Sequence, residues 1–106
     1  MLKLTGKAGK SFVVEAIQER YKYSRIYSYN DCVLPIMESY HVDSSDCTVG
    51  EFCQFIYEHI SKREKDDSPI DIVVIYTNLS DTEEIEKLAN RLECEQFVRM
   101  AVVTGR

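Results

Sequence analysis

The chain has 106 residues, of which 44% are hydrophobic and 29% charged, with only four glycines and two prolines. This length accommodates a single domain with one core, and the composition excludes a disordered or fibrous protein. The formal net charge of -5 repels a polyphosphate backbone, so we expect no nucleic-acid partner.

No apolar run approaches the roughly 20 residues that a membrane-spanning helix needs. The opening segment MLKLTGKAGKS lacks the apolar block of a signal peptide. We therefore expect one domain over residues 1–106, a cytoplasmic location and no membrane partner.

The N-terminal segment predicts a strand, a tight loop and a helix in immediate succession. Residues 1–5 alternate apolar and polar side chains before two glycines, as a short strand that enters a loop does. From Ser11 onward, apolar residues recur at helical spacing. They are Phe12, Val13, Val14, Ala16 and Ile17.

Residues 24–29 form a second predicted strand, in which Ile26 lies on one face and a row of tyrosines on the other. The row comprises Tyr23, Tyr27 and Tyr29. Such a row either stacks on a ligand or forms the amphipathic body of a strand that a helix covers, and the second arrangement is the more common.

Two helices are predicted in the middle of the chain. Asn30 and Asp31 turn the chain and cap a short helix that we expect to end near Tyr40, before a polar stretch over residues 41–46. Between residues 48 and 60, apolar side chains recur at helical spacing and predict an amphipathic helix. They are Val49, Phe52, Cys53, Ile56 and Ile60.

The last third of the chain predicts a buried strand, a helix and a final strand. Residues 70–76 are a nearly continuous β-branched run, typical of a central strand that is buried on both faces. Ser80 and Glu83 have the spacing of a capping box, and residues 97–103 supply the last strand. The helix between them carries an apolar stripe of Ile85, Leu88, Ala89 and Leu92.

The order is thus strand, helix, strand, helix, helix, strand, helix, strand. Strands separated by helices of this length favour parallel pairing with right-handed crossovers and with helices on both faces. We predict an α/β fold, a three-layer sandwich around a mostly parallel sheet of about four strands.

The cysteines at positions 32, 47, 53 and 94 contain no C-x-x-C pair, and we interpret them as free, buried thiols. The alternative is a zinc site built from Cys47, Cys53 and His59. Their spacing matches no common zinc-finger or ribbon pattern, so we expect no metal there.

The segment LTGKAGKS has the composition of a phosphate-binding loop. Glycines let backbone amides approach an anion, a lysine reaches the outer phosphates, and a hydroxyl at the helix start binds magnesium. The candidate nucleotide-binding residues are Gly6, Lys7, Gly9, Lys10 and Ser11. The implied cofactor is ATP, with Mg²⁺ bound to Ser11. If the protein is active, Lys10 is the candidate catalytic residue. If nucleotide binding has been lost, the protein has no cofactor.

The loop is two residues shorter than G-x-x-x-x-G-K-[ST], because Leu4 stands five positions before Gly9. A plain strand-to-helix turn is the alternative interpretation. The position of the loop between a strand and an amphipathic helix favours a phosphate loop, although a shorter loop has fewer amides to surround a β-phosphate.

Magnesium chemistry also needs a carboxylate at the end of a buried strand. The predicted central strand instead ends at Thr77 and Asn78, while Asp71 stands at its beginning and Asp81 in the next helix. The sequence thus has a candidate phosphate loop without an acidic counterpart on the predicted central strand.

The sequence resembles the phosphomevalonate kinase and deoxynucleoside monophosphate kinase group of P-loop kinases. TGKAGKSFVVEAIQERY is similar to that group's G-K-x-x-S-G-K-D-x-V-x-E-A-L segment. EFCQFIYEHIS resembles its later helix, IVVIYTNLSDTEEIEKL its strand and following helix, and FVRMAVVTGR its final strand. The resemblance implies a P-loop kinase-like fold, transfer of the terminal phosphoryl of ATP to a phosphorylated acceptor, and Lys10 as the P-loop lysine.

The sequence departs from that group at several functional positions. Ser11 replaces the aspartate that commonly follows the lysine, Thr77 falls at or near the strand-end aspartate, and the following arginines and the lid have no counterparts. Together these losses leave little to stabilise the transition state of phosphoryl transfer. We therefore predict a kinase-derived domain that is catalytically inactive and acts as a binding or regulatory protein.

Two alternatives remain open at this stage. The first is a small ATP-dependent phosphotransferase that acts on a nucleoside monophosphate or a phosphomevalonate-like acceptor, with its missing groups supplied by a partner. The second is association with a protein partner or a homodimer that covers a sheet edge.

Overall fold

A computed structural model describes residues 1–5, 10–30, 39–62 and 69–104. The elements in that part of the chain are β1 (Leu2–Thr5), α1 (Lys10–Arg20), β2 (Ser24–Asn30), β3 (Ser39–Asp43), α2 (Val49–Ser61), β4 (Ile72–Thr77), α3 (Glu83–Glu95) and β5 (Arg99–Thr104). None of these helices is long and apolar enough to cross a membrane.

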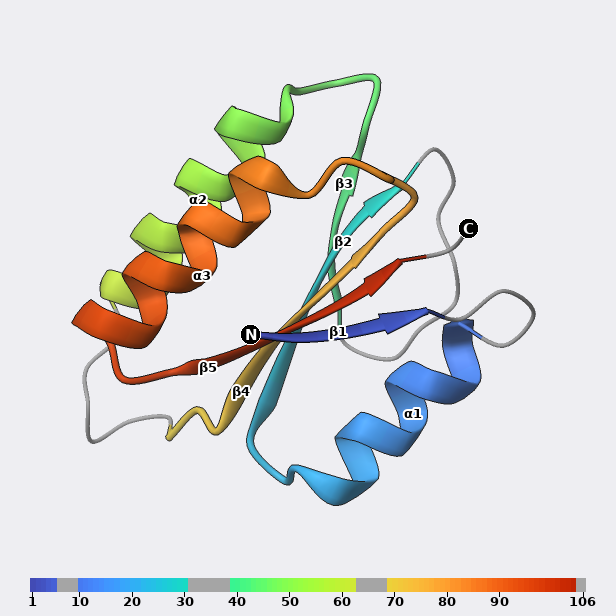
Figure 1. The fold of residues 1–106 in the computed structure, drawn as a ribbon, viewed down its shortest axis with the longest axis vertical. Coiled ribbons are helices and arrows are strands. Elements are labelled where there is room, and N and C mark those ends of the chain that lie inside the picture. Colours follow the sequence, from blue (N-terminus) through green and yellow to red (C-terminus); the bar gives the residue numbers. More distant parts are fainter. Residues whose placement is uncertain (6–9, 31–38, 63–68, 105–106) are drawn as a thin grey trace.

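The strands form one sheet in the order β1-β5-β4-β2-β3, and every pairing is parallel. Helix α1 lies on one face of the sheet, while α2 and α3 lie side by side on the other (Figure 1). The predicted α/β sandwich with helices on both faces is therefore confirmed. The described residues contribute five strands to the sheet, where about four were expected.

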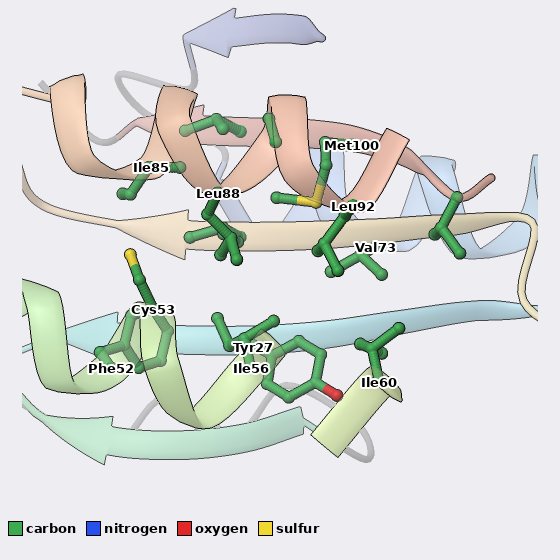
Figure 2. Packing of buried hydrophobic residues seen from close by; sticks show 14 of the residues in the cluster. Tyr27, Phe52, Cys53, Ile56, Ile60, Val73, Ile85, Leu88, Leu92 and Met100 are labelled. Atoms are coloured by element: carbon green, nitrogen blue, oxygen red, sulfur yellow. The ribbon is translucent and has the colours of Figure 1, made fainter. Parts of the chain in front are cut away.

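The sheet divides the core into two clusters. The larger cluster lies between the sheet and the helices α2 and α3, where side chains of both helices point at Tyr27, Val73 and Met100 (Figure 2). The smaller cluster lies beneath α1 and includes Val14 and Ile17 of that helix. Ala16, which was expected in the apolar stripe of α1, is exposed.

Strand β4 is the central strand, as its sequence predicts. All six of its residues are buried, and it pairs with β2 on one side and with β5 on the other. Val73 and Ile75 belong to the larger cluster, and Val74 and Tyr76 to the smaller one. A parallel strand covered on both faces needs apolar residues at every position, which explains its β-branched run.

The tyrosines of β2 form the body of a covered strand. Tyr27 and Tyr29 are buried against α2 and α3, whereas Ile26 faces α1, so the predicted alternation is confirmed for these three residues. Tyr23 precedes the strand and is 45% exposed.

Strand β3 corrects the prediction for residues 39–43. The predicted short helix was to reach Tyr40, but Ser39 and Tyr40 begin a strand that continues to Asp43 and pairs in parallel with β2. Tyr40 stacks on Tyr27 with their ring centroids 5.1 Å apart, and Val42 packs against the larger core cluster. Residues 31–38 of the predicted helix lie outside the described residues.

Helix capping also differs from the expectation. The predicted box at Ser80 is wrong, because Thr82 is the N-cap of α3 and makes no side-chain capping bond. Asp81 Oδ1 instead accepts a hydrogen bond from the Glu83 amide at 3.1 Å. A complete capping box stands at the start of α2, between Thr48 and Glu51.

The fully buried Leu92 of α3 tests the packing of the larger cluster. We expect Leu92→Ala to lower the free energy of unfolding by about 2–5 kcal/mol, because it removes buried methyl groups and leaves a cavity. The matched control is Asn90→Ala, an exposed position of the same helix, which should change stability by less than about 0.5 kcal/mol. Urea unfolding measures both, and equal midpoints for the two variants would contradict the packing described.

Candidate functional site

All five strands end on a polar residue at the carboxyl edge of the sheet. Thr104 lies in register with Thr5 on one side and with Thr77 on the other, and Asn30 lies opposite Asp43. In open parallel sheets, ligands bind in the crevice outside this edge. The carboxyl edge is therefore the candidate functional site.

The predicted phosphate loop connects to this edge. Strand β1 ends at Thr5 and α1 begins at Lys10, so Lys10 and Ser11 form the first turn of a helix that starts beside the carboxyl end of β1 (Figure 1). Gly6, Lys7 and Gly9 lie outside the described residues. The predicted succession of strand, loop and helix is confirmed at its two ends.

The connections at this edge lead to opposite faces of the sheet. The chain passes from β1 to α1 on one face, and from β4 to α3 on the other (Figure 1). Strand β5 lies between β1 and β4. In doubly wound sheets, ligands bind in the crevice that forms where neighbouring connections lead to opposite faces of the sheet.

Thr77 ends β4 next to this point and has a structural role. Its side chain is fully buried, and its Oγ1 accepts a hydrogen bond from the Leu79 amide at 3.0 Å. The hydroxyl thereby fixes the start of the connection to α3. The carboxyl end of β4, where magnesium chemistry would need a carboxylate, thus carries the neutral residue Thr77.

The cysteines provide no metal centre in the described part of the chain. No group of three or more histidine, cysteine, aspartate or glutamate side chains there could hold a metal ion. Burial raises the pKa of the Cys53 thiol to about 11 and also raises that of Cys47, so both thiols are protonated at neutral pH. Cys94 is exposed, contrary to the expectation of a buried thiol, and Cys32 lies outside the described residues.

A hydrogen-bonded group that the sequence analysis missed lies near the carboxyl ends of β2 and β3. Asn30 Nδ2 donates to Ser28 Oγ at 2.5 Å, and Ser28 Oγ lies 3.3 Å from His41 Nδ1. We call Ser28, Asn30 and His41 the polar relay. Ser28 is only 2% exposed, so its hydroxyl is not accessible as a nucleophile. The signal in the sequence is the alternation of Ile26, Ser28 and Asn30, which places two polar side chains on one face of a strand.

An aromatic group lies on the opposite face, between β2, β3 and α2. Tyr27 Oη and His59 Nδ1 are 2.6 Å apart, and the half-exposed rings of Tyr40 and Phe55 contact both residues. Burial raises the pKa of Tyr27 to about 12. Burial first, and the positive charge of Arg25 second, lower the pKa of His59 below its usual value of 6.5.

Comparisons with protein-family models, with curated proteins and with solved structures find no match for this chain. The resemblance to P-loop kinases therefore stays a prediction.

The lowered pKa of His59 predicts how stability depends on pH. Below about pH 6.5 the unfolded chain binds a proton at His59 that the folded protein takes up only at lower pH. Stability therefore falls as the pH decreases from about 6.5 to the folded-state pKa and levels off below it. We expect His59→Gln, which keeps an acceptor for Tyr27, to lose less stability than the original chain between about pH 7 and pH 5. Urea unfolding across this range measures the difference, and parallel stability curves would contradict it.

Proposed function

We propose that this protein is a kinase-derived, P-loop-like domain that binds a phosphate-bearing ligand at the β1–α1 turn and acts as a binding or regulatory protein without phosphoryl transfer. The support for binding is the start of α1 beside the carboxyl end of β1, together with Lys10 and Ser11 in its first turn. Amides at a helix N-terminus and the positive end of the helix dipole favour a bound anion.

The observation that carries the proposed loss of catalysis is Thr77. Phosphoryl transfer needs a metal ion that neutralises the charge developing on the transferred group, and a carboxylate usually holds that ion. Thr77 supplies only a hydroxyl, which already accepts from the Leu79 amide. Among the described strands, β3 ends on a carboxylate, that of Asp43. Ser45 already donates two hydrogen bonds to Asp43 Oδ1. Asp43 is also far from the β1–α1 turn, because three strands separate β3 from β1.

The start of α1 and the hydroxyl of Thr77 together support a site for an anion rather than for magnesium–ATP. Ser11 alone leaves most positions around a magnesium ion to water, since magnesium prefers six oxygen ligands. A protein of this kind would hold a phosphate group through backbone amides and Lys10, and its output would be a bound state rather than a product.

Binding can be tested by titration calorimetry with ADP and with inorganic phosphate. We expect Lys10→Ala to weaken binding about tenfold or more, because a charge-assisted hydrogen bond contributes about 1.5–3 kcal/mol. Lys22→Ala is the matched control, since Lys22 is exposed in the turn after α1. Equal affinities for the original chain and the Lys10 variant would refute binding at this turn.

The absence of catalysis needs its own assay. We expect purified protein with magnesium–ATP to transfer no phosphate to nucleoside monophosphates or to phosphomevalonate above the level of Lys10→Ala. Transfer that depends on Lys10 would instead support the alternative of a small phosphotransferase, and the proposal of an inactive domain would be abandoned.

A further inference from the structure

A pocket lies at the amino edge of the sheet, at the opposite end of the strands from the candidate functional site. It has a volume of about 340 Å³. Leu2, the first residue of β1, pairs with Ala101, so Arg99 and Met100 of β5 extend beyond β1 at this edge. The apolar walls of the pocket come from Met1, Leu2, Ile72 and Met100. Its volume is at the lower end of the usual range for ligand pockets, which suits a small molecule.

Arg99 brings a positive charge to this pocket. Its guanidinium lies over the ring of Tyr21, which also lines the pocket, 4.9 Å from the ring centroid. The guanidinium of Arg20 lies 5.7 Å from the same centroid. Neither arginine forms an ion pair in the part of the chain that the structure describes. The two charges give this edge a positive potential on a chain whose net charge is -5, and a positive potential favours a bound anion.

Arg91 of α3 has the same kind of stacking in a different charge environment. Its guanidinium lies 3.8 Å from the centroid of the Tyr57 ring, and its Nε is 4.0 Å from Glu95 Oε1. Arg99 has the aromatic contact without such a carboxylate. Its planar set of donors is therefore available to the carboxylate of a ligand, which an arginine binds with two parallel hydrogen bonds.

Glu93, the acidic residue of the pocket lining, limits the charge of that ligand. Its Oε1 accepts a hydrogen bond from the Met100 amide at 3.4 Å and lies 3.3 Å from the amino group of Met1, so this carboxylate already has partners. A second negative charge on the ligand would lie near Glu93 or against the apolar walls, where an unpaired charge is unfavourable. We propose that the pocket at the amino edge binds a small monocarboxylate, whose charged group pairs with Arg99 and whose apolar stem lies against the walls.

The pocket is separate from the proposed phosphate site. Arg99 begins β5 and Thr104 ends it, which places the two edges of the sheet roughly 16 Å apart at the usual rise per residue. Tyr21 directly follows the last residue of α1, whereas Lys10 is the first. Carboxylate binding at the amino edge therefore does not depend on the proposed function, and Lys10→Ala should leave it unchanged.

Four probes test the charge and the stem of the ligand. Hexanoate has both, hexanamide is its neutral counterpart, adipate carries a second carboxylate at the far end of the same chain, and acetate lacks the stem. Titrated into the ¹⁵N-labelled full chain, hexanoate should shift the Arg99 Nε–H and the backbone amides of Ile72 and Met100 in a saturable manner. Hexanamide loses the charge-assisted contact, adipate places a second charge on the apolar walls, and acetate buries no methylene groups. Each should therefore bind about tenfold more weakly or worse.

Variants at the exposed Arg99 locate the charged contact. Arg99→Gln should weaken hexanoate binding about tenfold or more and leave hexanamide binding unchanged, because it removes only the charged contact. Arg99→Lys keeps the charge without the planar donors, so its affinity for hexanoate should fall between the two. Arg91→Gln is the matched control, since it removes an arginine that stacks on a tyrosine outside this pocket, and it should bind hexanoate like the original chain.

A variant in the wall tests the stem independently of the charge. Leu2 is 48% exposed, so Leu2→Trp can narrow the pocket without a change in the buried core. It should weaken the binding of hexanoate and of hexanamide alike, because the stem of each probe then has less room.

Several results would overturn the proposal. Absence of saturable shifts with hexanoate would mean that solvent alone meets Arg99. Equal binding of hexanoate and hexanamide, or hexanoate binding that survives Arg99→Gln, would mean that the guanidinium does not recognise the carboxylate. Loss of hexanoate binding in Lys10→Ala would place the anion at the β1–α1 turn instead. A peptide that ends in leucine offers the same carboxylate from a protein terminus, and tighter binding of that peptide than of hexanoate would exclude a free acid as the occupant.

Discussion

The parallel pairing of β4 is the constraint on which the rest of the structure depends. β4 is hydrogen-bonded to β2 and β5, and all of its residues are buried. Parallel strands must be joined by crossovers and covered on both faces, and here α1 covers one face while α2 and α3 cover the other. Together with the parallel pairings of β1 with β5 and of β3 with β2, the pairing of β4 brings the carboxyl ends of the five described strands to one edge. The location of the candidate site is thus a consequence of how the core is built.

Local sequence patterns predict the elements whose stability depends on their own amphipathic faces. The apolar spacing of α2 and α3 and the β-branched run of β4 each indicate one structure, and the structure has them. β3 was missed because SYHVD is short and largely polar. Its extended form depends on pairing with β2 and on the stacking of Tyr40 against Tyr27, which are contacts between distant residues. Such tertiary contacts override local propensity.

The same distinction separates the parts of the candidate site. The turn between β1 and α1 could be placed at the carboxyl edge from the sequence, because it joins two adjacent elements. The polar relay could not, since it requires the register that sets His41 beside Ser28 on the neighbouring strand. The position of β1 at the edge of the sheet was equally hidden, because periodicity reports which face a residue occupies but not the order of the strands.

Thr77 links the core to the proposed chemistry at the edge. A carboxylate at this fully buried position would need a cation beside it, because an isolated buried charge is strongly unfavourable. Threonine needs only a hydrogen bond, which the Leu79 amide supplies while it fixes the connection to α3. Under the proposed function, Thr77 therefore has two consequences. It leaves β4 without a carboxylate that could hold a metal ion at this edge. It also lets the central strand remain stable without a bound ion. The stability of the core and the loss of catalysis would then have the same physical cause.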